Sequence, residues 1–236
     1  MTRWVLLSVA FTAAAVAGSA WFARPALDRL PERVAVHWDW KMRPDGWTTR
    51  EEVQRNPFWL LYGIPTGMAV LTLVGLALPW LSPRPFAVDS FRATFDYGIA
   101  IAVGLIGYLH AVILYGVLSG AGPSPNYLFA GLFLFFGLMG NVIGKVRKNF
   151  WMGVRTPWTL ASDRVWDRTH RLSAWLWTAS GLVGFVLALV LPEPWALALL
   201  PVFLVVILIP VPYSLWLYKR LERAGQLGEP AVSNQV

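Results

Sequence analysis

The polar residues with the most unusual spacing lie between two long apolar stretches, in residues 149–171, "NFWMGVRTPWTLASDRVWDRTHR". The segment contains four Arg, two Asp, three Trp and one His. Histidine is the residue type here whose ordinary pKa lies near neutral pH, so His170 is the candidate for acid–base chemistry. However, the chain has no Cys, no HExxH or GxSxG string and no phosphate-binding P-loop. We therefore predict a protein that is not an enzyme, with no catalytic residue and no cofactor.

A second group of polar side chains lies in residues 24–57, where His37 is followed by Asp39 and Asp45. His and Asp are metal ligands, but this spacing matches no closed zinc site, so we predict no metal. The alternative reading of this loop is a small folded surface with interfacial aromatic residues.

The local pattern of this loop predicts a strand and a turn. "VAVHW", residues 34–38, alternates as a short strand does, and "RPDGW", residues 43–47, has the Pro-Asp-Gly order of a tight turn. Three Trp suit the membrane–water interface, namely Trp38, Trp40 and Trp47.

The composition indicates which elements must position these polar segments. Of the 236 residues 56% are hydrophobic and 14% are charged, and about 20 apolar residues are needed for one helix to cross a bilayer. We predict an all-α membrane protein with about six transmembrane helices and a small extracytoplasmic loop that contains a short strand. The expected spans are residues 4–23, 57–80, 97–118, 127–144, 172–191 and 195–218.

The first span has an alternative interpretation. A basic start, an apolar run and small residues also describe a cleavable signal peptide, but the run of about 20 residues exceeds a typical signal core. We favour an uncleaved anchor. The expected divisions are residues 1–23 for the first helix, 24–57 for the extracytoplasmic loop, 58–126 for helices two and three, 127–218 for helices four to six, and 219–236 for a tail.

The distribution of Lys and Arg predicts the orientation. If the N-terminus is cytoplasmic, 13 of the 20 Lys and Arg fall on the cytoplasmic side. The other seven lie in residues 24–57, where six acids nearly balance them. We therefore expect both termini to be cytoplasmic. We attribute the net charge of +7 to this topology and to contact of basic residues with anionic lipid headgroups, and not to nucleic-acid binding.

Local rules predict the path of the charged segment. Pro157 disfavours a continuous helix before it, and Thr159 or Ser162 suits the cap of a short helix that starts near Asp163. Such a helix would lie on the membrane surface. Basic residues and Trp beside a span are common at membrane interfaces, but an interface alone does not explain the Asn, Gly, Pro and Thr in this segment.

The spacing of these Asn, Gly, Pro and Thr residues resembles that of a known protein family. Residues 140–171, "GNVIGKVRKNFWMGVRTPWTLASDRVWDRTHR", resemble the signature of the SdpI family of bacterial membrane proteins, and we call them the signature segment. Residues 30–47 are similar to an uncharacterised N-terminal domain often joined to that signature, although residues 40–43 depart from its pattern. The resemblance assigns functional residues Asn141, Lys145, Asn149, Gly153, Arg155, Thr156, Pro157, Trp158, Thr159, Trp166, Thr169, His170 and Arg171 in the segment, and His37, Asp45, Gly46 and Trp47 in the outer loop.

The resemblance implies a function in toxin immunity in the bacterial cell membrane. Its founding member protects a bacterium against a secreted, membrane-active peptide and holds a transcriptional repressor at the membrane. The implied partners are therefore lipids, a toxin peptide and a cytoplasmic repressor. A small-molecule transporter is the alternative, with His110 as the ionisable residue within the spans, although a lone His more often forms an interhelical hydrogen bond.

Overall fold

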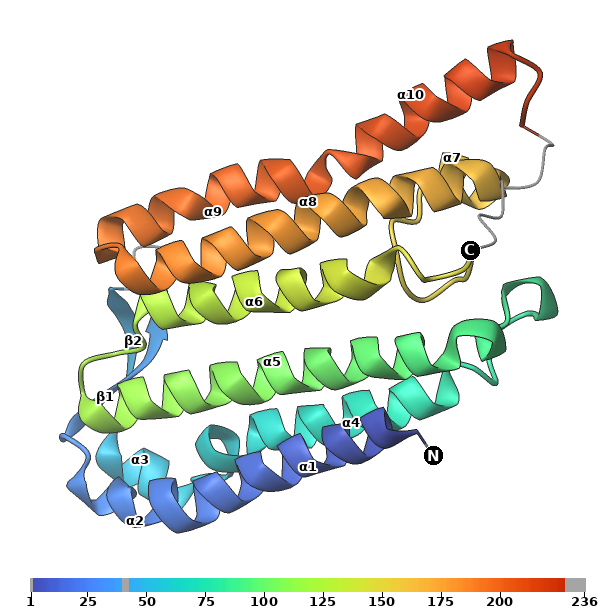
Figure 1. Ribbon diagram of the computed structural model, residues 1–236. Helices are drawn as coiled ribbons and strands as arrows, with labels where there is room; N and C mark the ends of the chain where they lie inside the picture. The colour runs from blue at the N-terminus through green and yellow to red at the C-terminus, as the bar shows by residue number, and fades with distance from the viewer. Residues whose placement is uncertain (1, 40–42, 228–236) are drawn as a thin grey trace.

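The structure is a computed structural model that describes residues 2–39 and 43–227. It consists of long helices and one two-stranded hairpin (Figure 1). The helices are α1 (Arg3–Gly18), α2 (Arg24–Ala26), α3 (Arg50–Arg55), α4 (Ile64–Ala77), α5 (Arg92–Ser119), α6 (Pro125–Ile143), α7 (Pro157–Ala161), α8 (Asp163–Val190), α9 (Glu193–Leu208) and α10 (Pro210–Arg223), and the strands are β1 (Arg33–Trp38) and β2 (Pro44–Thr49).

Six helical segments are long and apolar enough to cross a membrane, which confirms the predicted fold class. With the short helical turns that extend them, they cover Arg3–Arg29, Trp59–Ala77, Arg84–Ser119, Pro125–Ile143, Asp163–Val190 and Glu193–Arg223. The fifth begins nine residues earlier than we predicted, at Asp163 and not at Leu172. The sixth breaks at Ile209, before Pro210, and Trp177 Nε1 donates to the Ile207 carbonyl at 3.1 Å beside that break.

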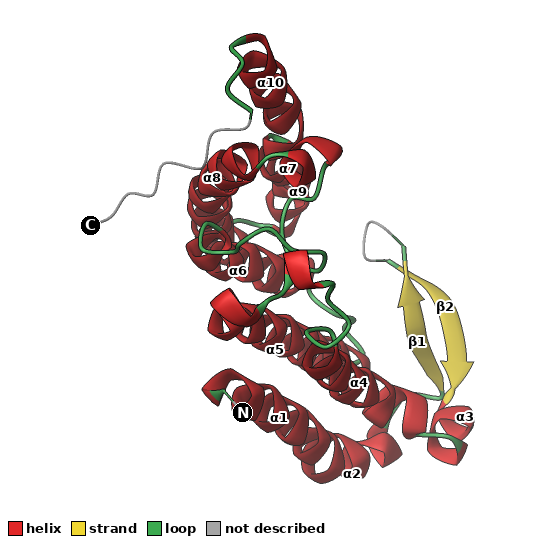
Figure 2. Ribbon diagram, turned by 90° about the vertical axis from the view of Figure 1, so that its right-hand side faces the viewer, coloured by secondary structure: helices red, strands yellow, loops and turns green. Residues whose placement is uncertain are grey.

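The helices form two groups that meet along α5 and α6. In one group α1 and α4 pack on α5, and in the other α8 packs on α6 and is covered by α9 and α10 (Figures 1 and 2). Both described chain ends and the signature segment lie at one end of the bundle, which we call the signature end (Figure 1). The β1–β2 hairpin lies at the opposite end, which we call the hairpin end.

Small residues allow α6 and α8 to pack closely. A Cβ on Gly181 would overlap the backbone of Gly137 and the Phe133 carbonyl, and one on Gly140 would overlap Thr178. Water cannot drive helix association inside a bilayer, so backbone approach and van der Waals contact must hold such a pair together. This packing places the C-terminal end of α6 and the first turns of α8 on either side of the irregular loop that joins α6 to α7.

We predict that Gly181→Val destabilises the fold, because the new side chain meets backbone atoms that cannot move independently. Overpacking of this kind costs about 1–3 kcal/mol of unfolding free energy. Gly67→Val is the matched control, because no heavy atom lies within 4 Å of a Cβ built on Gly67. Thermal unfolding in detergent should show a lower midpoint for Gly181→Val alone. Equal midpoints would contradict close packing of α6 on α8.

Candidate functional site

The signature segment runs from the last turn of α6 through an irregular loop and α7 into α8. The helix at Asp163 is not a separate surface helix, which corrects our prediction, because it continues without interruption to Val190. Trp166 and Thr169 are at most 1% exposed, so their face packs inside the protein and not on lipid. The apolar spacing was read correctly, but α10 and the loop, not the membrane, cover the face.

Asn149 organises the irregular loop and is completely buried. Its amide nitrogen donates to the carbonyls of Arg147 at 2.7 Å and Met152 at 3.0 Å. Its Oδ1 accepts from the backbone N–H of Trp151 at 2.7 Å and of Met152 at 2.8 Å. The side chain thus satisfies four backbone groups that no helix or strand could satisfy, and an amide is needed because both donors and acceptors are used.

His170 is the second buried centre of the segment and is completely buried. Its Nε2 accepts the backbone N–H of Val154 at 3.0 Å, so the proton lies on Nδ1, which donates to the Trp166 carbonyl at 2.8 Å. Both ring nitrogens are therefore used in the neutral form. The ring also stacks on Trp166 with centroids 4.0 Å apart.

Gly153 is required by the approach of His170. Its φ is +121°, which side-chain-bearing residues rarely adopt, and a Cβ there would overlap His170 Nε2. The chain therefore passes directly over the imidazole, and the next residue, Val154, delivers its N–H to the ring.

Two Thr form the start of α7 and connect it to α10. Thr156 is the N-cap of α7, since its hydroxyl accepts the Thr159 N–H at 3.2 Å. Ser162, one of the two residues predicted to cap the helix at Asp163, occupies the N-cap position of α8, but its side chain forms no capping hydrogen bond. The Thr159 hydroxyl accepts the Thr156 N–H at 2.9 Å and donates to the Val154 carbonyl at 2.8 Å. Thr156 also lies 3.0 Å from the Ser214 hydroxyl of α10. Pro157 fits the first position of α7, where no N–H is needed.

The Trp residues of the segment pack against two clusters. Trp166 donates its indole N–H to the Val146 carbonyl at 2.7 Å, which holds the loop against α8. Trp158 packs against Leu217 and Leu221 of α10. The Thr169 hydroxyl is buried, and we find no hydrogen-bond partner for it among the described residues.

The remaining signature residues face outward. Arg155 is exposed, and among the described residues it has no hydrogen bond or ion pair, whereas Lys148 pairs with Asp163 of α8. The exposed signature residues are Asn141, Lys145, Arg155, Pro157 and Arg171. The segment therefore consists of a buried hydrogen-bonded scaffold with cations on its outer surface.

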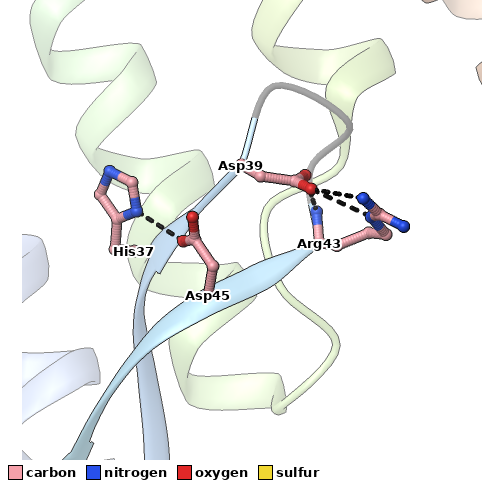
Figure 3. A network of polar contacts seen from close by, with 4 residues as sticks. All are labelled: His37, Asp39, Arg43 and Asp45. Atoms are coloured by element: carbon pink, nitrogen blue, oxygen red, sulfur yellow. Dashed lines mark hydrogen bonds and ion pairs between the residues drawn. The ribbon is translucent and has the colours of Figure 1, made fainter.

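The outer-loop residues lie at the hairpin end, so the structure does not bring them to the signature segment. His37 Nδ1 lies 2.6 Å from Asp45 Oδ1, and Asp39 forms an ion pair with Arg43 at 2.9 Å (Figure 3). The pairs are separate, and no cluster of three metal-ligating side chains occurs among the described residues.

The strand predicted at residues 34–38 is confirmed, but the turn predicted at residues 43–47 is wrong. Pro44–Thr49 form β2, with Gly46 opposite His37 at an irregularity in the register. Trp40, one of the three Trp predicted at the membrane interface, lies outside the described residues. Trp47 is 44% exposed and lies under the Arg33 guanidinium, 4.6 Å from it.

Other polar residues of the bundle were not predicted as contacts. Asp96 near the start of α5 is 3% exposed and accepts from Thr2 at 2.7 Å and Arg92 at 2.8 Å. The Arg92–Asp96 spacing was a visible signal for this pair. His110 forms an interhelical hydrogen bond with Ser19 at 3.0 Å, the contact that we expected of a lone His within the spans.

Comparisons with known proteins agree with this geometry. Residues 145–214, from the loop to the Ser214 contact on α10, match the model of the "SdpI/YfhL protein family". This domain belongs to the SdpI/YfhL family. The chain is also 31% identical over 94 residues to "Immunity protein SdpI" of Bacillus subtilis (strain 168), a match that covers 40% of this chain and 44% of that relative. No solved structure matches.

We predict that His170→Phe loosens the SdpI/YfhL domain. Phe keeps the ring but removes the acceptor, so the buried Val154 N–H is left unpaired at a cost of about 1–3 kcal/mol. Limited trypsin digestion should cleave faster after Arg155, and the melting midpoint should fall. The same substitution at the exposed His37 is the control. Unchanged cleavage would mean that the Val154 hydrogen bond does not hold the loop.

We predict that Asn149→Asp is more disruptive than its size suggests. The carboxylate cannot donate to the Arg147 and Met152 carbonyls and places a charge in a buried site, so the loop should lose more than about 2 kcal/mol. Hydrogen exchange at the Trp151 and Met152 amides should accelerate. Asn141→Asp, on an exposed residue of the same segment, should stay within about 0.5 kcal/mol of the parent. Equal effects of Asn149→Asp and Asn141→Asp on stability would mean that the four hydrogen bonds of Asn149 do not hold the loop.

Proposed function

We propose that this chain is a bacterial membrane immunity protein that protects the cell against a secreted, membrane-active peptide. The observation that carries the proposal is the buried Asn149–His170–Thr159 scaffold within the SdpI/YfhL domain. A lipid anchor needs charge and aromatic rings but no scaffold. The relative named as an immunity protein supports the same function.

The proposed working surface is the outward side of the signature segment. The scaffold fixes the backbone from Val146 to Thr159, and this holds Arg155 in a defined position with its guanidinium in solvent. Such a fixed cation suits a planar carboxylate or a phosphate on a partner. We propose that a cytoplasmic repressor meets the protein here.

The proposed orientation has both termini and the signature end in the cytoplasm. Six spans bring both chain ends to one side, and the excess of Lys and Arg lies there. The hairpin would then face the side from which a secreted peptide arrives. We propose that its exposed residues, such as His37, Asp45 and Trp47, lie where that peptide first meets the protein.

Transport has less support than immunity. The His110 imidazole, its candidate relay, is buried and already bonded to Ser19. No further chain of ionisable residues continues from His110 among the described residues of the spans.

Deletion of the gene tests the proposal directly. Deletion should increase killing by at least one peptide in a panel of hydrophobic and cationic membrane-active peptides, and the wild-type gene should restore growth. Expression of the chain in a sensitive bacterium should raise the inhibitory concentration of the same peptide. Unchanged sensitivity to the entire panel in both hosts would refute the proposal.

Arg155→Lys tests whether the fixed guanidinium is used. Lys keeps the charge but lacks the planar fork, so a partner bound through two parallel hydrogen bonds should lose about tenfold or more in affinity. We expect weaker protection or weaker membrane recruitment of the repressor at an unchanged protein level. Arg168→Lys, at an exposed position on the same end, is the matched control. Full function of Arg155→Lys would assign Arg155 to lipid contact alone.

A further inference from the structure

A long groove lies between α1 and α4, away from the signature segment. These helices pack beside one another at the edge of the bundle (Figures 1 and 2). One hollow between them has a volume of about 800 Å³, and its lining is apolar apart from Thr12 and Thr72. A second hollow of about 710 Å³ continues it toward the signature end, because the two share Val5, Leu73 and Leu76.

The groove ends in a charged site at the signature end. Thr2, Arg92 and Asp96 line the second hollow there. Asp96 is 3% exposed, and both of its oxygens are used, one by Thr2 and one by Arg92 Nε. The two terminal nitrogens of Arg92 form no hydrogen bond or ion pair with the described residues, and the side chain is 31% exposed.

This arrangement orients an arginine toward an anion. The Asp96 carboxylate holds Arg92 by Nε and leaves the outer donors directed away from that bond. Arg3 follows Thr2 and adds a second exposed cation beside the lining. An oxyanion such as a phosphate matches the free donors of a guanidinium.

The groove has the dimensions of a site for a lipid chain. From Val5 on α1 to Trp21, in the helical turn that continues α1, the rise is about 24 Å at 1.5 Å per residue, which exceeds the thickness of about 15 Å of one leaflet core. Trp21 is 75% exposed at one end and Trp80 is 87% exposed at the other. Such aromatic residues mark the two interfaces of a bilayer, so the Arg92 site lies at the level of the headgroups.

We propose that this groove binds one phospholipid, with an acyl chain between α1 and α4 and its phosphate on Arg92. The groove opens to the bilayer, and its walls offer water almost no polar partner, so a hydrocarbon chain is the matching occupant. The positive charge of Arg92 favours a lipid that carries a negatively charged phosphate group. The site is independent of the proposed immunity function, because it contains no residue of the signature segment.

Native mass spectrometry of the full-length protein, released from detergent, tests the site. The wild-type protein should retain one phospholipid. Leu73→Trp should lose it, because Leu73 lines both hollows and the larger side chain fills them. Leu204→Trp on the exposed face of α9 is the matched control and should retain the lipid. Arg92→Gln should lower the lipid affinity about tenfold, since a charge-assisted contact is lost.

Several results would overturn the proposal. No retained phospholipid on the wild-type protein, or equal retention by Leu73→Trp and Leu204→Trp, would show that the groove is not a lipid site. Unchanged affinity in Arg92→Gln would remove the phosphate contact. Detection of a second copy of the chain in place of lipid, abolished by Leu73→Trp, would assign the groove to a dimer. Should Arg92→Gln fail to fold, the Trp pair still decides the question.

Discussion

The structure depends on one constraint: backbone polar groups that are shielded from water, by lipid or by the protein itself, must find partners within the protein. Six spans satisfy this by helix formation. The irregular stretch between α6 and α7 cannot pair its backbone groups in a helix, so side chains form hydrogen bonds with them instead. Asn149 forms hydrogen bonds with four backbone groups, His170 accepts the Val154 N–H, and the Thr159 hydroxyl donates to the Val154 carbonyl. These residues are structural supports before they are anything else.

The same constraint explains how the segment is linked to the helices around it. Close packing of Gly137 against Gly181 fixes α6 on α8, so the loop between them has little freedom. Contact between Thr156 and Ser214 then adds α10. The family match ends at Ser214, which agrees with a unit that needs α10 to be complete.

Much of the architecture followed from the apolar runs and the breaks between them. The strand at residues 34–38 and the pairing of His110 with another helix were also predictable. Residues 43–47 were not, because Pro-Asp-Gly fits a turn locally, whereas cross-strand pairing with Arg33–Trp38 makes those residues a strand. The helix at Asp163 was placed on the lipid surface, because an amphipathic pattern does not say what covers its apolar face.

The sequence by itself determined six spans, the position of the charged segment between two of them and the residues that set it apart from an ordinary interface. Hydropathy and charge act locally, so composition and spacing suffice for these. Only the tertiary structure decided which signature residues are buried. Asn149, Thr159 and His170 face inward, while Arg155 and Lys145 face out, because burial depends on the contact of helices distant in sequence. It also revealed the groove that ends at Arg92, because its two walls come from α1 and α4, which are distant from each other along the chain.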